Sequence, residues 1–167
     1  MPFNYYHRLT AAQKREYRKS DRILAVPLPE LKSFLPLVPA LADALEGGNH
    51  RQTQRQAQAL ITAIVRTLGI RPLKVIVLER RPSATWGELQ GLYEPGEPDR
   101  ITVWMRTAKR QQVVAFKTFL RTLLHELGHH LDYEFLHLAD TFHTEGFFKR
   151  ESNLFHQLVG QSDHLSP

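Results

Sequence analysis

The first seventy residues place apolar side chains at the three- and four-residue spacing of helices. A short helix is predicted over residues 10–20, with Thr10 as its N-cap, and a longer one over residues 53–68. Residues 28–46 are also apolar at helical spacing, but two prolines interrupt them and two glycines end them. Residues 1–70 are therefore expected to form a helical N-terminal part.

The pattern then changes to the alternation of strands. Residues 73–79 are rich in β-branched side chains, and residues 87–94 and 100–106 alternate between apolar and polar positions. A turn-forming stretch, EPGEPD, separates the last two. The sequence therefore predicts a small antiparallel sheet, a three-stranded meander.

Helical spacing returns in the C-terminal half, over residues 113–135 and 144–159. The first of these helices carries one apolar stripe, formed by Phe116, Leu120, Leu123, Leu127 and Leu131. Helices, then strands, then helices is the order of an α+β fold, and 167 residues are enough for a single domain with its own core. We expect residues 71–160 to hold the sheet and the helices of the functional site within one domain, 1–167.

The predicted helix over residues 113–135 contains the sequence HELGH at residues 125–129, an HExxH motif. His125 and His129 are one helical turn apart on the side opposite the apolar stripe, so both imidazoles can reach one metal ion. Glu126 is turned by about 100° from His125, beside the open position of the metal. A carboxylate there can take a proton from water on the metal and pass it to a leaving amine. The motif therefore predicts a zinc site with Glu126 as general base.

The composition limits which ligands and partners the chain can use. It contains no cysteine, so disulfides and thiolate ligands are excluded, and any zinc is held by histidine or carboxylate side chains. Lysine and arginine number 22 against 17 acidic residues, and the net charge of +5 predicts weak nucleic-acid binding through a basic surface. No stretch reads as a signal peptide or a membrane span, which favours a cytoplasmic protein without a membrane partner.

A catalytic zinc takes three protein ligands, and two residues compete for the third place. His143 lies at the start of the last predicted helix, whereas Glu151 lies within that helix among apolar side chains. If the motif helix continues to about residue 138, Glu151 returns level with His129, and His143 is on the order of 13 Å away along the axis. If the helix ends soon after Asp132, His143 can fold back over the metal. The spacing leaves both alternatives open.

The motif and its surroundings resemble the SprT-like zinc metalloproteases, the family that includes the Spartan proteases. The resemblance extends over residues 85–155 and rests on HExxH, on the segment HTEGF that begins at His143, and on ITVWMRT, which is similar to the family's edge strand. It implies a zincin-like metalloprotease domain. Carried over by position, it also implies zinc on His125, His129 and His143, with Glu126 as the base.

A gluzincin-like arrangement, in which Glu151 is the third ligand, is also similar to this chain. Thr144 stands where SprT-like proteases usually have glycine. We favour His143 as the third ligand and expect Glu151 beside the metal site. A carboxylate on so apolar a face otherwise needs a cation, for which Arg121 is a candidate.

Four further polar residues have predicted roles near the site. Asp132, one turn after the motif, is expected to orient a ligand imidazole. His130 points away from the metal side and is expected to be structural. Tyr93 or Tyr133 could stabilise an oxyanion, and the sequence does not select between them.

These predictions combine into a zinc-dependent metallopeptidase that hydrolyses peptide bonds with a metal-activated water. A peptide or protein substrate would lie extended along the strand 100–106 and add to the edge of the sheet by main-chain hydrogen bonds. The alternative is a non-catalytic, zinc-stabilised binding or regulatory module that associates with nucleic acid.

Overall fold

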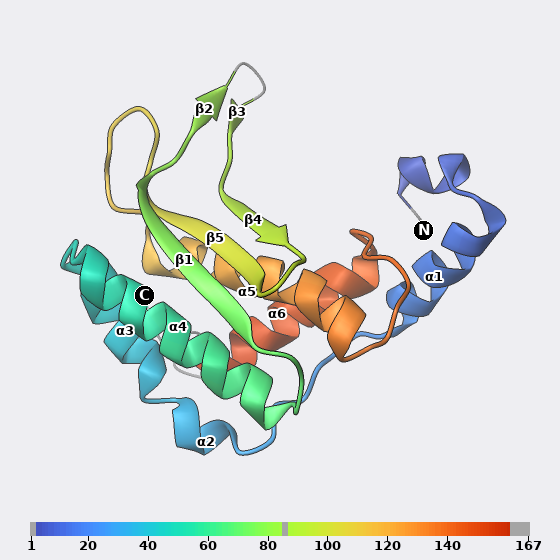
Figure 1. The fold of residues 1–167 in the computed structure, drawn as a ribbon, viewed down its shortest axis with the longest axis horizontal. Coiled ribbons are helices and arrows are strands. Elements are labelled where there is room, and N and C mark those ends of the chain that lie inside the picture. Colours follow the sequence, from blue (N-terminus) through green and yellow to red (C-terminus); the bar gives the residue numbers. More distant parts are fainter. Residues whose placement is uncertain (1–2, 85–86, 161–167) are drawn as a thin grey trace.

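The computed structural model describes residues 3–84 and 87–160 of the chain (Figure 1). The N-terminal elements are a short 3-10 helix, η1 (Asn4–Arg8), followed by α1 (Ala11–Arg22), α2 (Leu31–Phe34), α3 (Leu37–Glu46) and α4 (His50–Thr67). The strands are β1 (Leu73–Arg80), β2 (Ser83–Ala84), β3 (Gly87–Glu88), β4 (Gly91–Glu94) and β5 (Asp99–Arg106). The last helices are α5 (Phe116–Glu134) and α6 (Glu145–Val159). This order confirms the predicted α+β fold.

Side-chain caps explain where two of the helices begin. The hydroxyl of Thr10 accepts from the backbone N–H of Gln13, whose side chain accepts from Thr10 in return, so the predicted cap of α1 is confirmed. Asn49 caps α4 by accepting from the N–H of Gln52, and this helix therefore begins earlier than its apolar pattern predicts. Pro36 separates α2 from α3, as the interrupted pattern indicates.

The main sheet has the order β1-β5-β4 and contains both parallel and antiparallel pairs (Figure 1). β1 is parallel to β5, with Val77 opposite Val103, whereas β4 is antiparallel to β5, with Tyr93 opposite Ile101. The predicted antiparallel meander is therefore wrong. The run 87–94 is divided into β3, which forms a hairpin with β2, and β4, which returns on the far side of β5.

β5 pairs with β1 along one edge and with β4 along the other, and its side chains are covered on both faces. Ile101 and Val103 are buried as their alternation predicts, but Thr102 and Trp104 between and beyond them are buried too. Since both edges of β5 are paired within the sheet, no edge of this strand is left for another chain, which an alternating pattern does not reveal. The expectation that residues 100–106 offer an open edge to substrate is therefore wrong.

The two edges of this sheet differ in how far they are closed. The side chain of Gln54, on α4, bonds to the backbone of Val75 and Val77. Gln58, one turn later, bonds in the same way to Leu73 and Val75, so α4 closes the β1 edge. β4 forms the opposite edge and lies beside α5 (Figure 1). It is the edge that can accept another extended chain.

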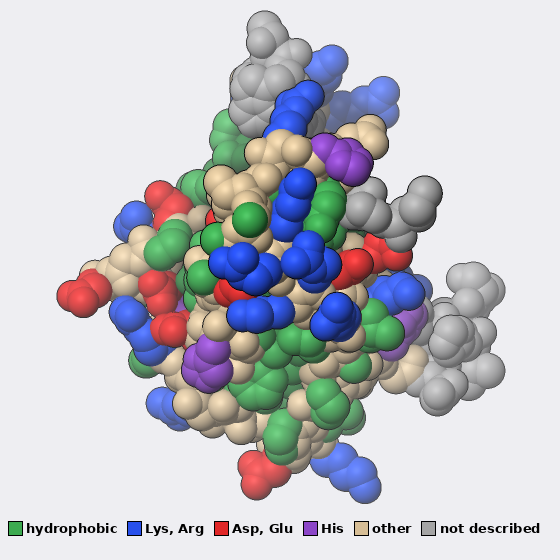
Figure 2. All heavy atoms as spheres, turned by 90° about the vertical axis from the view of Figure 1, so that its right-hand side faces the viewer, with side chains coloured by type: hydrophobic (Ala, Val, Ile, Leu, Met, Phe, Trp, Pro, Cys, Tyr) green, Lys and Arg blue, Asp and Glu red, His purple; other side chains and the backbone are tan. Residues whose placement is uncertain are grey.

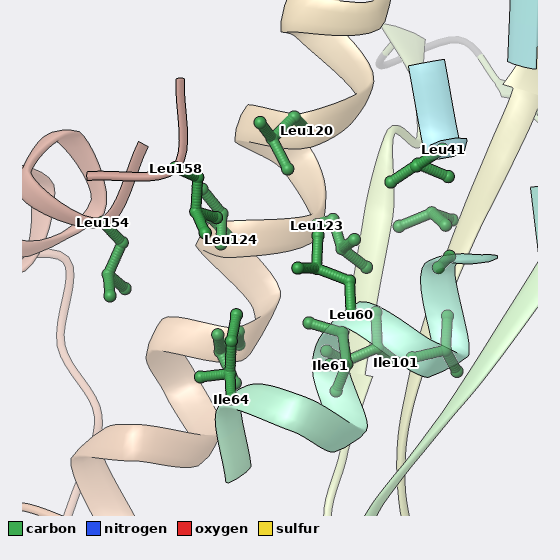
Figure 3. Close-up of a cluster of buried hydrophobic side chains, with 14 of the residues drawn as sticks. Leu41, Leu60, Ile61, Ile64, Ile101, Leu120, Leu123, Leu124, Leu154 and Leu158 are labelled. Atoms are coloured by element: carbon green, nitrogen blue, oxygen red, sulfur yellow. The ribbon is translucent and has the colours of Figure 1, made fainter. Parts of the chain in front are cut away.

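The core lies between the sheet and helices α3, α4, α5 and α6. Figure 3 shows side chains from these elements meeting, among them Leu41, Leu60, Ile61, Ile64, Ile101, Leu120, Leu123, Leu124, Leu154 and Leu158. A fully buried leucine contributes about 1.5–3 kcal/mol relative to an exposed one, so the apolar stripe anchors α5 and leaves its other side for polar residues. None of the helices in residues 3–84 and 87–160 combines the length and the apolar character of a membrane span.

Candidate metal centre

α5 ends shortly after Asp132, and this decides which side chain meets the motif histidines. The backbone N–H of Leu138 donates to the carbonyl oxygen of Asp132, which turns the chain back along the helix. The segment between α5 and α6 then brings His143 to His125 and His129. This is the arrangement expected for a motif helix that ends early.

The three histidines direct their Nε2 atoms at a common point. Nε2 of His143 lies 3.1 Å from Nε2 of His125 and 3.1 Å from Nε2 of His129. Around a tetrahedral zinc with bonds of about 2.0–2.1 Å, ligand atoms are roughly 3.3 Å apart. The spacing of these nitrogens therefore fits three ligands of one metal ion, and the three side chains form a group that could hold one.

His125 is oriented by Glu151, which comes from α6. The Nδ1–H of His125 donates to Oε1 of Glu151 at 2.7 Å, which leaves the lone pair of this imidazole on Nε2. Glu151 therefore lies behind the histidine and outside the group of converging nitrogens. Arg121, the cation considered as its partner, instead stacks on Phe155, with 3.9 Å between the guanidinium carbon and the ring centroid.

His129 is oriented through a chain of three polar groups. Its Nδ1–H donates to the hydroxyl of Thr141 at 2.8 Å, and that hydroxyl donates to Oδ2 of Asp132 at 2.7 Å. The other oxygen of Asp132 accepts from the guanidinium of Arg150 at 3.0 Å. Asp132 is thus linked to the imidazole of His129 through Thr141, which no sequence pattern singled out, and its role in orienting a metal ligand stays a prediction.

Burial favours the neutral form of His129 and His143, which is the form that binds metal. Burial, followed by the charges of His143 and His125, lowers the pKa of His129 to about 3. The pKa of His143 is also lowered, first by burial and then by His125. Since His125 and His129 both donate from Nδ1, their Nε2 lone pairs converge, and a cation between them is the natural partner.

Glu126 is buried beside the histidines and lines a cavity on each side of them. Burial raises the pKa of its carboxyl group to about 7, while His125 acts to lower that pKa and Glu151 to raise it. A carboxyl group with a pKa near neutrality can accept a proton and release it within one reaction. A metal ion on the imidazoles would lower this pKa and favour the carboxylate.

β4 crosses the motif helix at Gly91, where the space admits no larger residue. A Cβ atom at this position would lie 2.7 Å from the methyl carbon of Thr122 and 3.2 Å from Oε1 of Glu126. Gly91 is a residue that the sequence reasoning missed, although a glycine within a strand pattern is a signal of close backbone approach. As a result, the backbone of the open edge strand lies directly against the candidate base.

Two cavities flank the histidines and share Gly91, His125 and Glu126 in their walls. One, of about 420 Å³, extends toward the start of α5 and is lined by Arg121. The other, of about 510 Å³, extends toward the end of α5 and is lined by Tyr133. An extended chain that passes the histidines along β4 would reach both cavities with side chains on either side of the site.

The two phenols considered for an oxyanion role lie in different settings. Nε2–H of His130 donates to the carbonyl oxygen of Arg71, so we assign Nδ1 as the acceptor of the Tyr93 hydroxyl at 3.0 Å. Tyr93 is thereby engaged with His130, whose complete burial agrees with the structural role predicted for it. Both phenols line the second cavity, but the Tyr93 hydroxyl is already bonded to His130, so Tyr133 is the phenol that the geometry leaves for this role.

The N-terminal segment also holds His143, a connection that no sequence pattern predicts. The hydroxyl of Tyr5 donates to the carbonyl oxygen of His143 at 3.0 Å, and the ring of Tyr5 contacts those of Tyr17 and Phe142. At the start of α6, Gly146 packs so closely against the end of α1 that a Cβ atom there would overlap its backbone. Residues far apart in the sequence therefore position the third imidazole.

Exposed basic side chains gather along α1. Arg15, Arg18, Lys19 and Arg22 are all exposed there. Figure 2 shows lysine and arginine side chains concentrated on the face of the molecule that α1 occupies. This face has the character expected of a surface for weak nucleic-acid binding, which stays a prediction.

Comparisons of this chain with protein-family models, with curated proteins and with solved structures find no match. The likeness to SprT-like proteases therefore rests on the motif residues alone. What the chain can do has to be inferred from the three imidazoles, the buried carboxyl group and the open strand edge.

Proposed function

We propose that this chain is a zinc-dependent metallopeptidase, with the zincin-like arrangement of the SprT-like proteases. Zinc is held by His125, His129 and His143, and Glu126 is the general base. The observation that carries the proposal is the convergence of three Nε2 atoms, two of them 3.1 Å from the third, beside a buried carboxyl group.

The ligand set favours zinc in a catalytic setting. Imidazole nitrogens suit zinc, and the chain has no cysteine to form the thiolate sites of most structural zincs. A closed structural site needs a fourth ligand. Glu151 is the carboxylate that could be considered as this fourth ligand, but it accepts from Nδ1 of His125 on the side away from the converging nitrogens. This favours the peptidase over a zinc-stabilised binding module.

The residues around the metal suit peptide hydrolysis. A bound zinc would polarise the peptide carbonyl and lower the pKa of water. Glu126 accepts the proton of that water and passes it to the leaving amine. The edge of β4 can bind an extended peptide by main-chain hydrogen bonds, and Gly91 keeps that edge against Glu126.

The test separates metal binding from hydrolysis. Purified protein loaded with zinc is assayed on denatured, fluorescently labelled casein, together with Glu126→Gln and the control Glu46→Gln, an exposed carboxylate at the end of α3. We expect Glu126→Gln to keep its zinc and to lose hydrolysis by about 10²–10⁴-fold, whereas the control keeps both. Equal hydrolysis by the wild type and Glu126→Gln contradicts the mechanism.

A further inference from the structure

Arg121 brings a positive charge to the wall of the first cavity, next to the candidate metal centre. It lies one helical turn before His125 on α5, and both side chains line this cavity of about 420 Å³. Gln90 and the hydroxyl-bearing residues Thr118 and Thr122 also contribute to the wall. The wall of this cavity is therefore polar around the guanidinium of Arg121, and the cavity opens on the site where a peptide bond would react.

The guanidinium of Arg121 is held in place but has no carboxylate partner in the part of the chain that the structure describes. Its carbon lies 3.9 Å from the centroid of the buried Phe155 ring, which fixes the flat guanidinium group by stacking. Within residues 3–84 and 87–160, no carboxylate lies within ion-pair distance of Arg121. A half-buried, pre-positioned guanidinium with free N–H groups is a receptor for a carboxylate.

The two acidic residues that line the same cavity, Glu126 and Glu151, do not form an ion pair with Arg121. Glu151 accepts from His125 at 2.7 Å, and Glu126 lies beside the three imidazoles. Neither of them satisfies Arg121, and with a divalent cation bound the charges around the cavity sum to a positive value. A substrate carboxylate is therefore the group that this cavity fits by charge.

We propose that Arg121 makes this cavity a binding subsite for a carboxylate of the peptide substrate, within two residues of the scissile bond. The inference rests on the proposed peptidase function. The short reach follows because the cavity shares Gly91, His125 and Glu126 with the site of hydrolysis, and an extended chain advances only about 3.3 Å per residue. The carboxylate belongs either to an aspartate or glutamate side chain or to a free C-terminus.

The experiment measures cleavage preference in the full-length, zinc-loaded protein. A library of decapeptides in which each amino acid occurs at each position is prepared in two forms, one with free and one with amidated C-termini. Both forms are digested. If the subsite binds an acidic side chain, cleavage should concentrate next to aspartate and glutamate in both arms. If it binds a free C-terminus, cleavage should concentrate near the C-terminus in the first arm and be lost in the amidated arm. In the best single peptide, replacing the acidic group by its amide should lower kcat/KM about tenfold.

Charge variants assign the preference to the subsite. Arg121→Gln should bring the acid-to-amide ratio of kcat/KM to about one, and Arg121→Glu should turn the preference toward lysine. Arg55→Gln, an exposed arginine on α4, removes the same charge and should leave the ratio unchanged. Cleavage without any acid preference, or a preference that survives Arg121→Gln, overturns this inference alone. A zinc-loaded wild type that cleaves no peptide overturns it together with the proposed function.

Discussion

The candidate metal centre is assembled from two regions that are held in different ways. His125 and His129 belong to α5, where helical geometry alone sets their separation. His143 belongs to the irregular segment before α6, and its backbone is held by Tyr5 from the other end of the chain. Local structure therefore supplies two of the candidate ligands, whereas the third depends on tertiary packing, in which the N-terminal helices take part.

The strongest test of this contrast removes one ligand from each region. If the three imidazoles share one zinc, His143→Ala and His129→Ala should each lower the zinc content from about one per chain to near zero. Glu151→Ala should retain metal, because this carboxylate contacts Nδ1 of His125. Zinc content is measured by mass spectrometry after gel filtration. Retention of zinc by His143→Ala, with loss by Glu151→Ala, would restore the gluzincin-like ligand set.

A smaller effect is expected from the polar groups that orient the two helical ligands. Thr141→Val removes the hydroxyl between His129 and Asp132, and Glu151→Gln removes the charge behind His125. Each change should weaken zinc binding by about 10–100-fold, since such outer partners fix the orientation and basicity of the ligand.

Affinity for these variants is measured by competition with a chromophoric chelator. Thr118→Val is the matched control, because Thr118 is an exposed threonine of α5 whose side chain has no part in the two chains of hydrogen bonds. If Thr141→Val binds zinc as tightly as this control, the Asp132 chain supports the fold and not the metal.

The same contrast explains what could be predicted from the sequence. The motif helix, its apolar stripe and the Thr10 cap are local, because each depends on residues within a few turns of one another. The choice between His143 and Glu151 depends on where α5 ends, which periodicity does not fix to within a turn.

The features that sequence reasoning missed all depend on long-range contacts. β5 is central because it pairs with β1 on one edge and with β4 on the other, and β4 reaches Glu126 because Gly91 has no side chain. Thr141 bonds to His129, 12 residues earlier, and Tyr5 bonds to His143, 138 residues later. None of these partnerships leaves a periodic signal, although the strand glycine could have been read as a close approach.

The smallest expected effect tests whether the N-terminal segment acts on the metal site. Tyr5→Phe removes the hydrogen bond to the carbonyl oxygen of His143 but keeps the ring against Tyr17 and Phe142. One such bond is worth about 0.5–1.5 kcal/mol, which is up to roughly tenfold in an equilibrium constant. Zinc affinity should therefore fall by less than in Thr141→Val, because the position of His143 is loosened while its imidazole remains.

The comparison needs a variant that perturbs the same segment without touching His143. Tyr6→Phe serves, because the Tyr6 hydroxyl accepts from Arg18 on α1 while its ring packs on Tyr17. If Tyr5→Phe and Tyr6→Phe bind zinc equally well in the chelator competition, His143 is positioned by its own segment alone. If only Tyr5→Phe is weakened, the N-terminal helical part belongs to the metal centre, because a hydroxyl 138 residues away in sequence then contributes to the third ligand.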